Sequence, residues 1–328
     1  MHRFIPRSPR RFRRFTVLLA VIGCSLSMPS AAAASPQLDR WEQLRAQDLR
    51  VAGVAYKLSV RNTGLCPDAQ APQAGFVLHS IEQYDPADRQ GASRKFGMAS
   101  YVGVMAVVEG SPAQRSGLAA DDQLVSVNGR DLRIAEAAAD PVPTRSAVAS
   151  AQSILASEMA KGEIILRVSR AGAIHDLHFT TDTGCALSVE LMTDGQVNAW
   201  ADGERVVVSD GIVALCARDA DLALVIGHEL AHNLLHHSEA LTAAGSARRQ
   251  VRLTGTGSVG MQETEEEADR LGVQLASGAT YDLGGALAFI ARLLDANGAD
   301  PAAETHPLPA RRLALLKAEI TAALRRGL

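Results

Sequence analysis

Two histidines and a glutamate in the string HELAH, residues 228–232, are the strongest chemical signal in this chain. On a helix His228 and His232 lie four residues apart and project from one face, so both imidazoles can hold a single zinc ion. Glu229 then lies beside the metal, where its carboxylate can take a proton from a water that zinc activates near neutral pH. This chemistry is amide hydrolysis. The alternative is a pair of surface histidines beside an ordinary glutamate, and a third ligand decides between them.

The residues around this string predict a helix. Residues 219–226 (DADLALVI) are apolar at helical spacing, and Ala231, Leu234 and Leu235 continue the pattern without a proline. A metzincin-type site would place a glycine and a third histidine shortly downstream, where this chain has Leu235 and Ser238. That type of site is excluded.

An acidic stretch, ETEEEADRLG at residues 263–272, offers the third ligand. Glu265 and Asp269 are one helical turn apart and can point the same way. A catalytic zinc ion normally takes three protein ligands, and a nearby carboxylate commonly accepts the other N–H of a ligand histidine. We therefore expect Glu265 to bind the metal and Asp269 to orient a ligand. The other acidic residues are interpreted as a solvated helix face: Glu263, Glu266 and Glu267.

Several motifs follow one another in an order that resembles the HtpX/BepA/CAAX-protease family of zinc metallopeptidases. They are HELAH, E-x-x-A-D-x-x-G at residues 265–272, His306-Pro307, Arg312, and an upstream Asn-Ala strand within residues 197–215. The resemblance implies that His228, His232 and Glu265 are the ligands of one zinc ion, that Glu229 is the base, and that Asp269 orients a ligand histidine. It also implies a catalytic place for His306, which would lie near the zinc ion and contact the substrate or close the site.

His237 matches a histidine often found at the end of the family's metal helix, and we interpret it as a surface or helix-end residue. The segment between the two metal motifs departs from the family, because it contains no apolar run long enough for a membrane hairpin. A soluble protein is expected. Residues 238–262 are polar, glycine-rich and basic at Arg248, Arg249 and Arg252, so we expect a mobile loop over the cleft.

Within that loop GTGSVG, residues 255–260, matches a dinucleotide-binding pattern. The pattern needs a buried strand before it, and RRQVRL is too charged for one. The loop interpretation is favoured over a nucleotide site.

A second unit is indicated by residues 101–132, YVGVMAVVEGSPAQRSGLAADDQLVSVNGRDL, which resemble a bacterial PDZ domain. Alternating apolar residues followed by Asn128-Gly129 also predict a strand and a turn. Residues 146–160 predict a helix, and residues 163–180 predict two strands joined by Ala171-Gly172. PDZ domains add a peptide strand to a sheet edge and often hold its C-terminal carboxylate. We expect the binding loop at Tyr101, Val102, Gly103 and Val104. The alternative is a packing unit that only shapes the peptidase cleft.

The start of the chain resembles a bacterial secretion signal, with basic residues 7–14, apolar residues 15–22 and the small-residue run 31–34. Cleavage near Ala34 would leave a periplasmic or secreted protein. The alternative is a lipobox around Cys24, whose lipidation would tether the protein to a membrane. Of the three cysteines left after cleavage, Cys66 and Cys185 lie in turn-like contexts and are expected to form a disulfide, while Cys216 lies in an apolar run and is expected to stay a buried thiol.

Length and composition support two domains. The chain has 328 residues, of which 47% are hydrophobic and 4% aromatic, and its formal net charge of -3 gives no sign of nucleic-acid binding. We predict an α+β protein: a signal peptide (1–34), a mostly helical zincin-type peptidase in two parts (35–94 and 183–328), and an inserted β-rich PDZ domain (95–182). Residues 76–81 are assigned to the first peptidase part as a strand.

Two classes of function stay open. The first is a zinc endopeptidase of the bacterial cell envelope for protein quality control, in which the PDZ domain captures protein or peptide substrates through exposed C-termini. The second is a peptide-binding chaperone or adaptor with latent or no proteolysis. Glu229 favours the enzyme, because an adaptor has no need of a base between two ligands.

Overall fold

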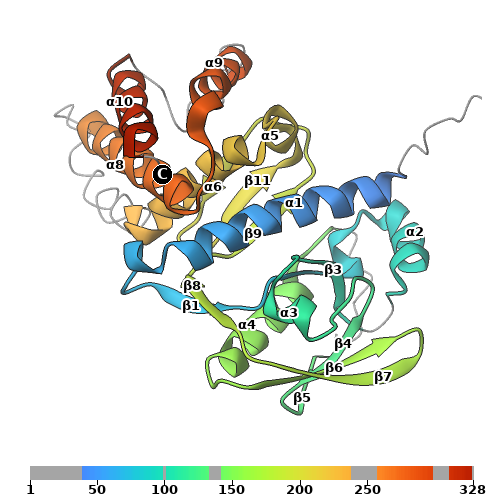
Figure 1. The fold of residues 1–328 in the computed structure, drawn as a ribbon. Coiled ribbons are helices and arrows are strands. Elements are labelled where there is room, and N and C mark those ends of the chain that lie inside the picture. The colour runs from blue at the N-terminus through green and yellow to red at the C-terminus, as the bar shows by residue number, and fades with distance from the viewer. Residues whose placement is uncertain (1–38, 99–100, 133–141, 238–256, 298–309, 327–328) are drawn as a thin grey trace, which may run out of the picture. The chain divides into compact units, whose positions relative to one another are not determined.

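Figure 1 shows the fold in a computed structural model, which describes residues 39–98, 101–132, 142–237, 257–297 and 310–326. The expected signal segment, Cys24, His306 and residues 238–256 of the expected loop lie outside the described residues. The described chain combines a β-rich unit with a half that is mostly helical after residue 210, which confirms the predicted α+β class.

The β-rich unit contains a six-stranded antiparallel sheet with the order β2-β3-β4-β6-β7, and β5 pairs with β4. The strands are β2 (Phe76–His79), β3 (Gly103–Val107), β4 (Gln123–Val127), β5 (Arg130–Asp131), β6 (Ile164–Arg170) and β7 (Ala173–Phe179). The helices are α2 (Pro86–Phe96), α3 (Pro112–Arg115) and α4 (Ser146–Met159). Alternate residues of β6 are buried in one hydrophobic cluster with the apolar face of α4, and this cluster is distinct from the core of the helical half.

Two tight turns connect strands of this sheet as the sequence predicts. Asn128 and Gly129 have φ angles of 48° and 80°, and Ala171 and Gly172 have φ angles of 49° and 82°. Two successive residues with positive φ make the turn whose twist matches a β-hairpin. The strands β6 and β7 pair as the predicted hairpin. The predicted helix is also present, as α4.

The β-rich unit includes β2, which lies before the start expected for this unit at residue 95. The backbone of β2 pairs with β3, from Phe76 opposite Val107 to His79 opposite Gly103, so this strand belongs to the β-rich sheet and not to the peptidase part. The sequence of a four-residue strand does not show which sheet the strand joins. Its partner here is β3, which is more than 20 residues away in the chain.

The helical half is built on α1 (Arg40–Arg61) and a three-stranded sheet with the order β10-β11-β9. Asp39 caps α1, because its side chain accepts hydrogen bonds from the backbone N–H groups of Trp41 and Glu42. The other elements are β9 (Val189–Met192), β10 (Ala199–Ala201), β11 (Val206–Ser209), α5 (Asp210–Leu215), α6 (Asp219–Leu234), α8 (Gly257–Gly278), α9 (Ala286–Asn297) and α10 (Ala310–Arg326). Short 3-10 helices lie at η1 (Thr63–Leu65), η2 (Ile81–Gln83) and η3 (Leu283–Gly285).

Helix α6 lies at the centre of this half and packs against α1, α8 and β10. Its residues Leu222, Ile226 and Leu230 have no exposed surface. Burying one such side chain contributes about 1.5–3 kcal/mol. This packing fixes the helix that carries HELAH.

Helix α8 begins at Gly257, so Gly257–Gln262 are helical and the expectation of a loop through residue 262 is wrong. The reason is tertiary, since α8 packs along α6 and a packed helix overrides the low helix propensity of glycine. Within the described ranges, no helix has both the length and the apolar character needed to cross a lipid bilayer.

The chain enters and leaves the β-rich unit through a two-stranded ribbon, in which β1 (Gln70–Gln73) pairs with β8 (Asp182–Cys185). Cys66 and Cys185 form a disulfide at this ribbon, with their Cα atoms 5.6 Å apart, which is the pairing expected from the sequence. Cys216 is a buried free thiol, and burial raises its pKa to about 12. The disulfide therefore ties together the two connections between the halves.

We expect Cys66→Ala/Cys185→Ala to lower the free energy of unfolding by about 2–4 kcal/mol, because the bond closes a long loop in the unfolded chain. Chemical unfolding of the oxidised protein and of this variant measures the difference. Cys216→Ala is the matched control, since it removes a buried thiol that has no bond to lose. Peptide mapping without reductant should find Cys66 joined to Cys185, and free thiols at both positions would contradict the pairing.

Candidate functional site

Helix α6 brings His228 and His232 onto one face, and their Nε2 atoms lie 3.1 Å apart. The helix begins with the acidic residues Asp219 and Asp221, which suit the positive end of the helix dipole. Glu229 is 3% exposed on the same helix. The pattern HELAH therefore forms the local arrangement that the sequence predicts.

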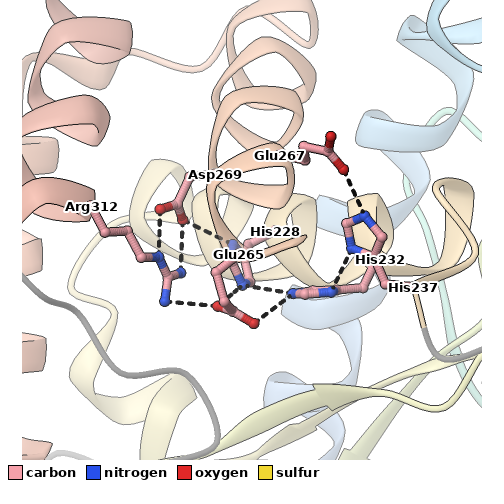
Figure 2. A network of polar contacts seen from close by, with 7 residues as sticks. All are labelled: His228, His232, His237, Glu265, Glu267, Asp269 and Arg312. Atoms are coloured by element: carbon pink, nitrogen blue, oxygen red, sulfur yellow. Dashed lines mark hydrogen bonds and ion pairs between the residues drawn. The ribbon is translucent and has the colours of Figure 1, made fainter. Parts of the chain in front are cut away.

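Glu265 on α8 completes a triangle with the two histidines (Figure 2). One carboxylate oxygen lies 3.5 Å from Nε2 of His228, and the other lies 3.4 Å from Nε2 of His232. In a tetrahedral site with metal–ligand distances of 2.0–2.1 Å, neighbouring ligand atoms are about 3.3–3.4 Å apart. The three side chains thus fit a single metal ion, and a His-His-Glu donor set suits zinc.

A close crossing of two helices sets this distance. Gly227 on α6 faces Gly272 on α8, and a Cβ atom at residue 272 would lie 2.9 Å from the backbone nitrogen of His228. Any side chain at Gly272 would push α8, and Glu265 with it, away from the two histidines. The last position of the E-x-x-A-D-x-x-G motif is therefore a glycine for a steric reason: the close helix crossing leaves no space for a side chain there.

Behind the triangle, Asp269 contacts His228, and Arg312 on α10 joins both carboxylates (Figure 2). Nδ1 of His228 lies 3.0 Å from a carboxylate oxygen of Asp269. Arg312 donates to Asp269 at 2.6 and 2.9 Å and lies 2.7 Å from Glu265. Arg312 is 3% exposed. The expected role of Asp269 as the partner of a ligand histidine has the geometry it requires.

The charges of this network shift three pKa values. Burial lowers the pKa of His228, but hydrogen bonds to Asp269 and Glu265 outweigh it and raise the pKa to about 10 in the metal-free site. Burial raises the pKa of Asp269, but hydrogen bonds from His228 and Arg312 hold it below its usual range. Burial likewise opposes the charge of Arg312, whose pKa the two carboxylates raise. Because a ligand histidine must offer a lone pair, a metal ion held here would compete with a proton for His228.

His237 lies just past the end of α6, as the helix-end interpretation has it, but it is not at the surface. It is 4% exposed, and its Nδ1 lies 3.0 Å from Nδ1 of His232. Its Nε2 lies 3.3 Å from a carboxylate oxygen of Glu267. No sequence signal predicts this contact, because His237 follows the end of α6 at Leu234 and helical spacing no longer applies there.

The acidic stretch is also less uniform than expected. Glu263 is exposed, as interpreted, whereas Glu266 is 4% exposed and lies 2.9 Å from Arg311. Only part of this helix face is solvated. Glu266 contacts Arg311 and Glu265 contacts Arg312, both on α10, which is distant in sequence, so periodicity within α8 could not show these two partners.

The expected peptide-binding loop, Tyr101, Val102, Gly103 and Val104, does not offer an open sheet edge. Gly103 and Val104 lie in β3, which pairs with β2 on one side and β4 on the other, and Val102 is 1% exposed. An added strand needs an unpaired edge. In the sheet of the β-rich unit the described edge strands are β2 and β7, and β2 is the one beside this loop, with only β3 as a neighbour.

An open cavity of about 990 Å³ follows this edge. It is lined by β2 and the preceding residues Gln73, Ala74 and Gly75 on one side and by α4 on another, and α1 and β9 contribute the remaining walls. Gly75 has a φ of 79°, so the chain turns sharply before the strand begins. We call this cavity the β2–α4 groove.

The β2–α4 groove has a charged wall on the side of the helical half. Arg145 at the start of α4 lies 2.8 Å from Glu190 on β9. Burial, together with the charge of Glu190, raises the pKa of Asp48 on α1 to about 7. The wall therefore carries an arginine–glutamate ion pair and a carboxyl group whose pKa is raised.

Together these features define a metallopeptidase with an added peptide-binding unit. Residues 177–266 match the profile of peptidase family M48, and residues 103–140 match the profile of the PDZ domain. The chain thus carries a metallopeptidase domain of family M48 and a PDZ domain, as the sequence resemblances imply. The first match includes His228, Glu229, His232 and Glu265 and ends before Asp269.

The solved structures similar to part of this chain include the crystal structure of the HtrA3 PDZ domain bound to a phage-derived ligand. It shares 21% sequence identity with this chain, with a TM-score of 0.24, and the match covers 35% of this chain and 88% of that one.

Proposed function

We propose that this protein is a zinc-dependent endopeptidase of the bacterial cell envelope that takes part in protein quality control. The observation that carries the proposal is the triangle of His228, His232 and Glu265 with Glu229 on the same helix. A peptide-binding adaptor has no use for a buried carboxylate beside a set of metal ligands.

The residues of the site divide the chemistry among them. A zinc ion held by His228, His232 and Glu265 would supply a Lewis acid that activates water and polarises the scissile carbonyl. Glu229 accepts the proton of the attacking water as the C–O bond forms, and it passes that proton to the amide nitrogen as the C–N bond breaks. Asp269 holds the Nδ1 proton of His228, and Arg312 neutralises the carboxylates behind the site.

An extended substrate has a natural partner in β10, which lies at an edge of the three-stranded sheet in the described chain and packs on α6. The turn after β10 is held to α6 by a hydrogen bond from the backbone N–H of Gly203 to the side chain of Asn233, 2.9 Å long. A peptide that pairs with this edge passes beside the metal helix.

We further propose that the β2–α4 groove captures substrates, through a peptide strand that adds to β2. The support is the free edge of β2 and the groove beside it, which replace the loop expected from the sequence. Exposed C-termini of protein substrates are the expected ligands, because PDZ domains commonly hold a terminal carboxylate.

The proposed cell-envelope location rests on the basic, apolar and small-residue runs of residues 7–34. Cleavage near Ala34 would release a periplasmic or secreted protein, and lipidation of Cys24 would instead anchor it to a membrane. Mass spectrometry of the mature N-terminus distinguishes the two. The formal net charge of -3 gives no support for a nucleic-acid partner.

Digestion of an unfolded protein with and without a metal chelator tests the proposed activity. We expect internal cleavage, seen by mass analysis of the fragments, that stops on chelation and returns when zinc is added. If purified protein reconstituted with zinc produces no fragments, the endopeptidase proposal is wrong and the adaptor takes its place.

A substitution in the β2–α4 groove is expected to separate capture from chemistry. Ala156 is exposed and lines the groove from α4, so Ala156→Trp fills it without changing the core. We expect KM for a protein substrate to rise about ten-fold, which corresponds to about 1.4 kcal/mol of binding, while cleavage of a short peptide is unchanged.

The matched control is Ser157→Trp, at an exposed neighbour that does not line the groove. It should leave both substrates unaffected. Equal losses on protein and peptide with Ala156→Trp would show that the unit is structural.

A further inference from the structure

The two ligand histidines are supported in different ways. His228 contacts a buried carboxylate directly, through Nδ1 and Asp269. His232 instead contacts another histidine, His237, which in turn reaches Glu267 at the surface (Figure 2). The side chain of Glu267 is 58% exposed, whereas that of His237 is 5% exposed. A buried imidazole therefore connects a metal ligand to a solvated carboxylate.

The contacts determine where each ring proton lies. Nε2 of His232 faces Nε2 of His228 and Glu265, so this nitrogen must keep its lone pair for the metal. Its proton is then on Nδ1, which donates to Nδ1 of His237. His237 must accept there and consequently carries its own proton on Nε2, which points at Glu267. Every ring nitrogen of the two histidines has one assigned role.

The backbone brings His237 into place through a left-handed residue. α6 ends at Leu234, and His236 has a φ of 53°, which reverses the chain. The next side chain, His237, returns beneath His232 and is buried there. Ordinary helix geometry would place residue 237 away from residue 232, since side chains five residues apart do not share a face.

We propose that His237 is a positioning residue for the metal site: it accepts the Nδ1 proton of His232 and so holds the Nε2 atom of His232 toward the metal, and Glu267 keeps His237 in the accepting tautomer. This proposal rests on the proposed metal site. It adds to the three ligands a supporting residue just past the end of α6. Partners of this kind fix the ring orientation of a ligand histidine, and their loss typically weakens metal binding by about 10–100-fold.

Metal affinity and the spectrum of cobalt test the proposal without relying on proteolysis. In His237→Ala we expect the dissociation constant for zinc, measured by chelator competition, to rise about 10–100-fold, and the visible absorption bands of the Co²⁺-loaded protein to shift. His237→Asn keeps an acceptor near the place of Nδ1 and should recover most of the affinity and the wild-type bands. Glu267→Gln should weaken binding less than His237→Ala, because Glu267 acts through His237.

His236→Asn is the matched control, since His236 is exposed and asparagine tolerates a positive φ. It should leave affinity and spectrum unchanged. Circular dichroism establishes that each variant is folded, and the exposed position of Glu267 keeps the test available should His237→Ala fail to fold. Wild-type affinity and bands in folded His237→Ala, or equal losses in the alanine and asparagine variants, would overturn the proposal. A wild-type protein that binds zinc tightly but cleaves nothing would instead refute the endopeptidase function alone.

Discussion

Replacing Glu229 with glutamine is expected to lower the rate of hydrolysis at least ~100-fold, the usual scale of general-base catalysis. Glutamine keeps the shape of the side chain but cannot accept the proton of the attacking water. Because Glu229 is not one of the three ligands, zinc content and thermal stability should stay at the wild-type level. Single-turnover cleavage of a peptide, with zinc measured on the same samples, gives both quantities.

Variants of the proposed ligands distinguish the role of Glu229 as a base from a role in holding zinc. His228→Ala and Glu265→Ala should also be inactive, but through loss of zinc, so added metal at high concentration distinguishes them from Glu229→Gln. Wild-type cleavage by the glutamine variant would show that another group is the base. The proposed mechanism would then be wrong even though the metal site remained.

Replacing Arg312 with leucine is expected to lower the free energy of unfolding by about 3–5 kcal/mol, the cost of leaving a buried charge without its partner. Arg312 joins α10 to α8, because its guanidinium group forms ion pairs with the carboxylates of Asp269 and Glu265. Without it two buried carboxylates lie close together with no arginine between them. Chemical unfolding of chelated and zinc-loaded protein measures the loss in each form.

The double variant Arg312→Leu/Asp269→Asn should recover part of this loss, because it removes one of the stranded charges. Arg325→Leu, at the exposed end of the same helix, is the control and should change stability by less than about 0.5 kcal/mol. An equal effect of the two leucine substitutions would show that Arg312 contributes only helix packing.

Much of the helical half and of the metal site follows from local patterns. The spacing of His228 and His232 and the apolar residues around them already require a helix with two imidazoles on one face. Turn residues such as Asn128-Gly129 and Ala171-Gly172 predict their hairpins, because few residues adopt positive φ at low cost. The contrast between turn-like and apolar contexts predicts the pairing of Cys66 with Cys185.

The sequence by itself determined which residues form the candidate metal site, since two proposed ligands and the proposed base lie within five consecutive residues and Glu265 lies in one short motif. Tertiary structure alone decided what surrounds that site. The burial of His237 beneath His232, the membership of β2 in the PDZ sheet, and the free edge along the β2–α4 groove all depend on segments far apart in the chain. Helical and strand periodicities report which face of an element is buried, but they carry no information about which distant element covers it.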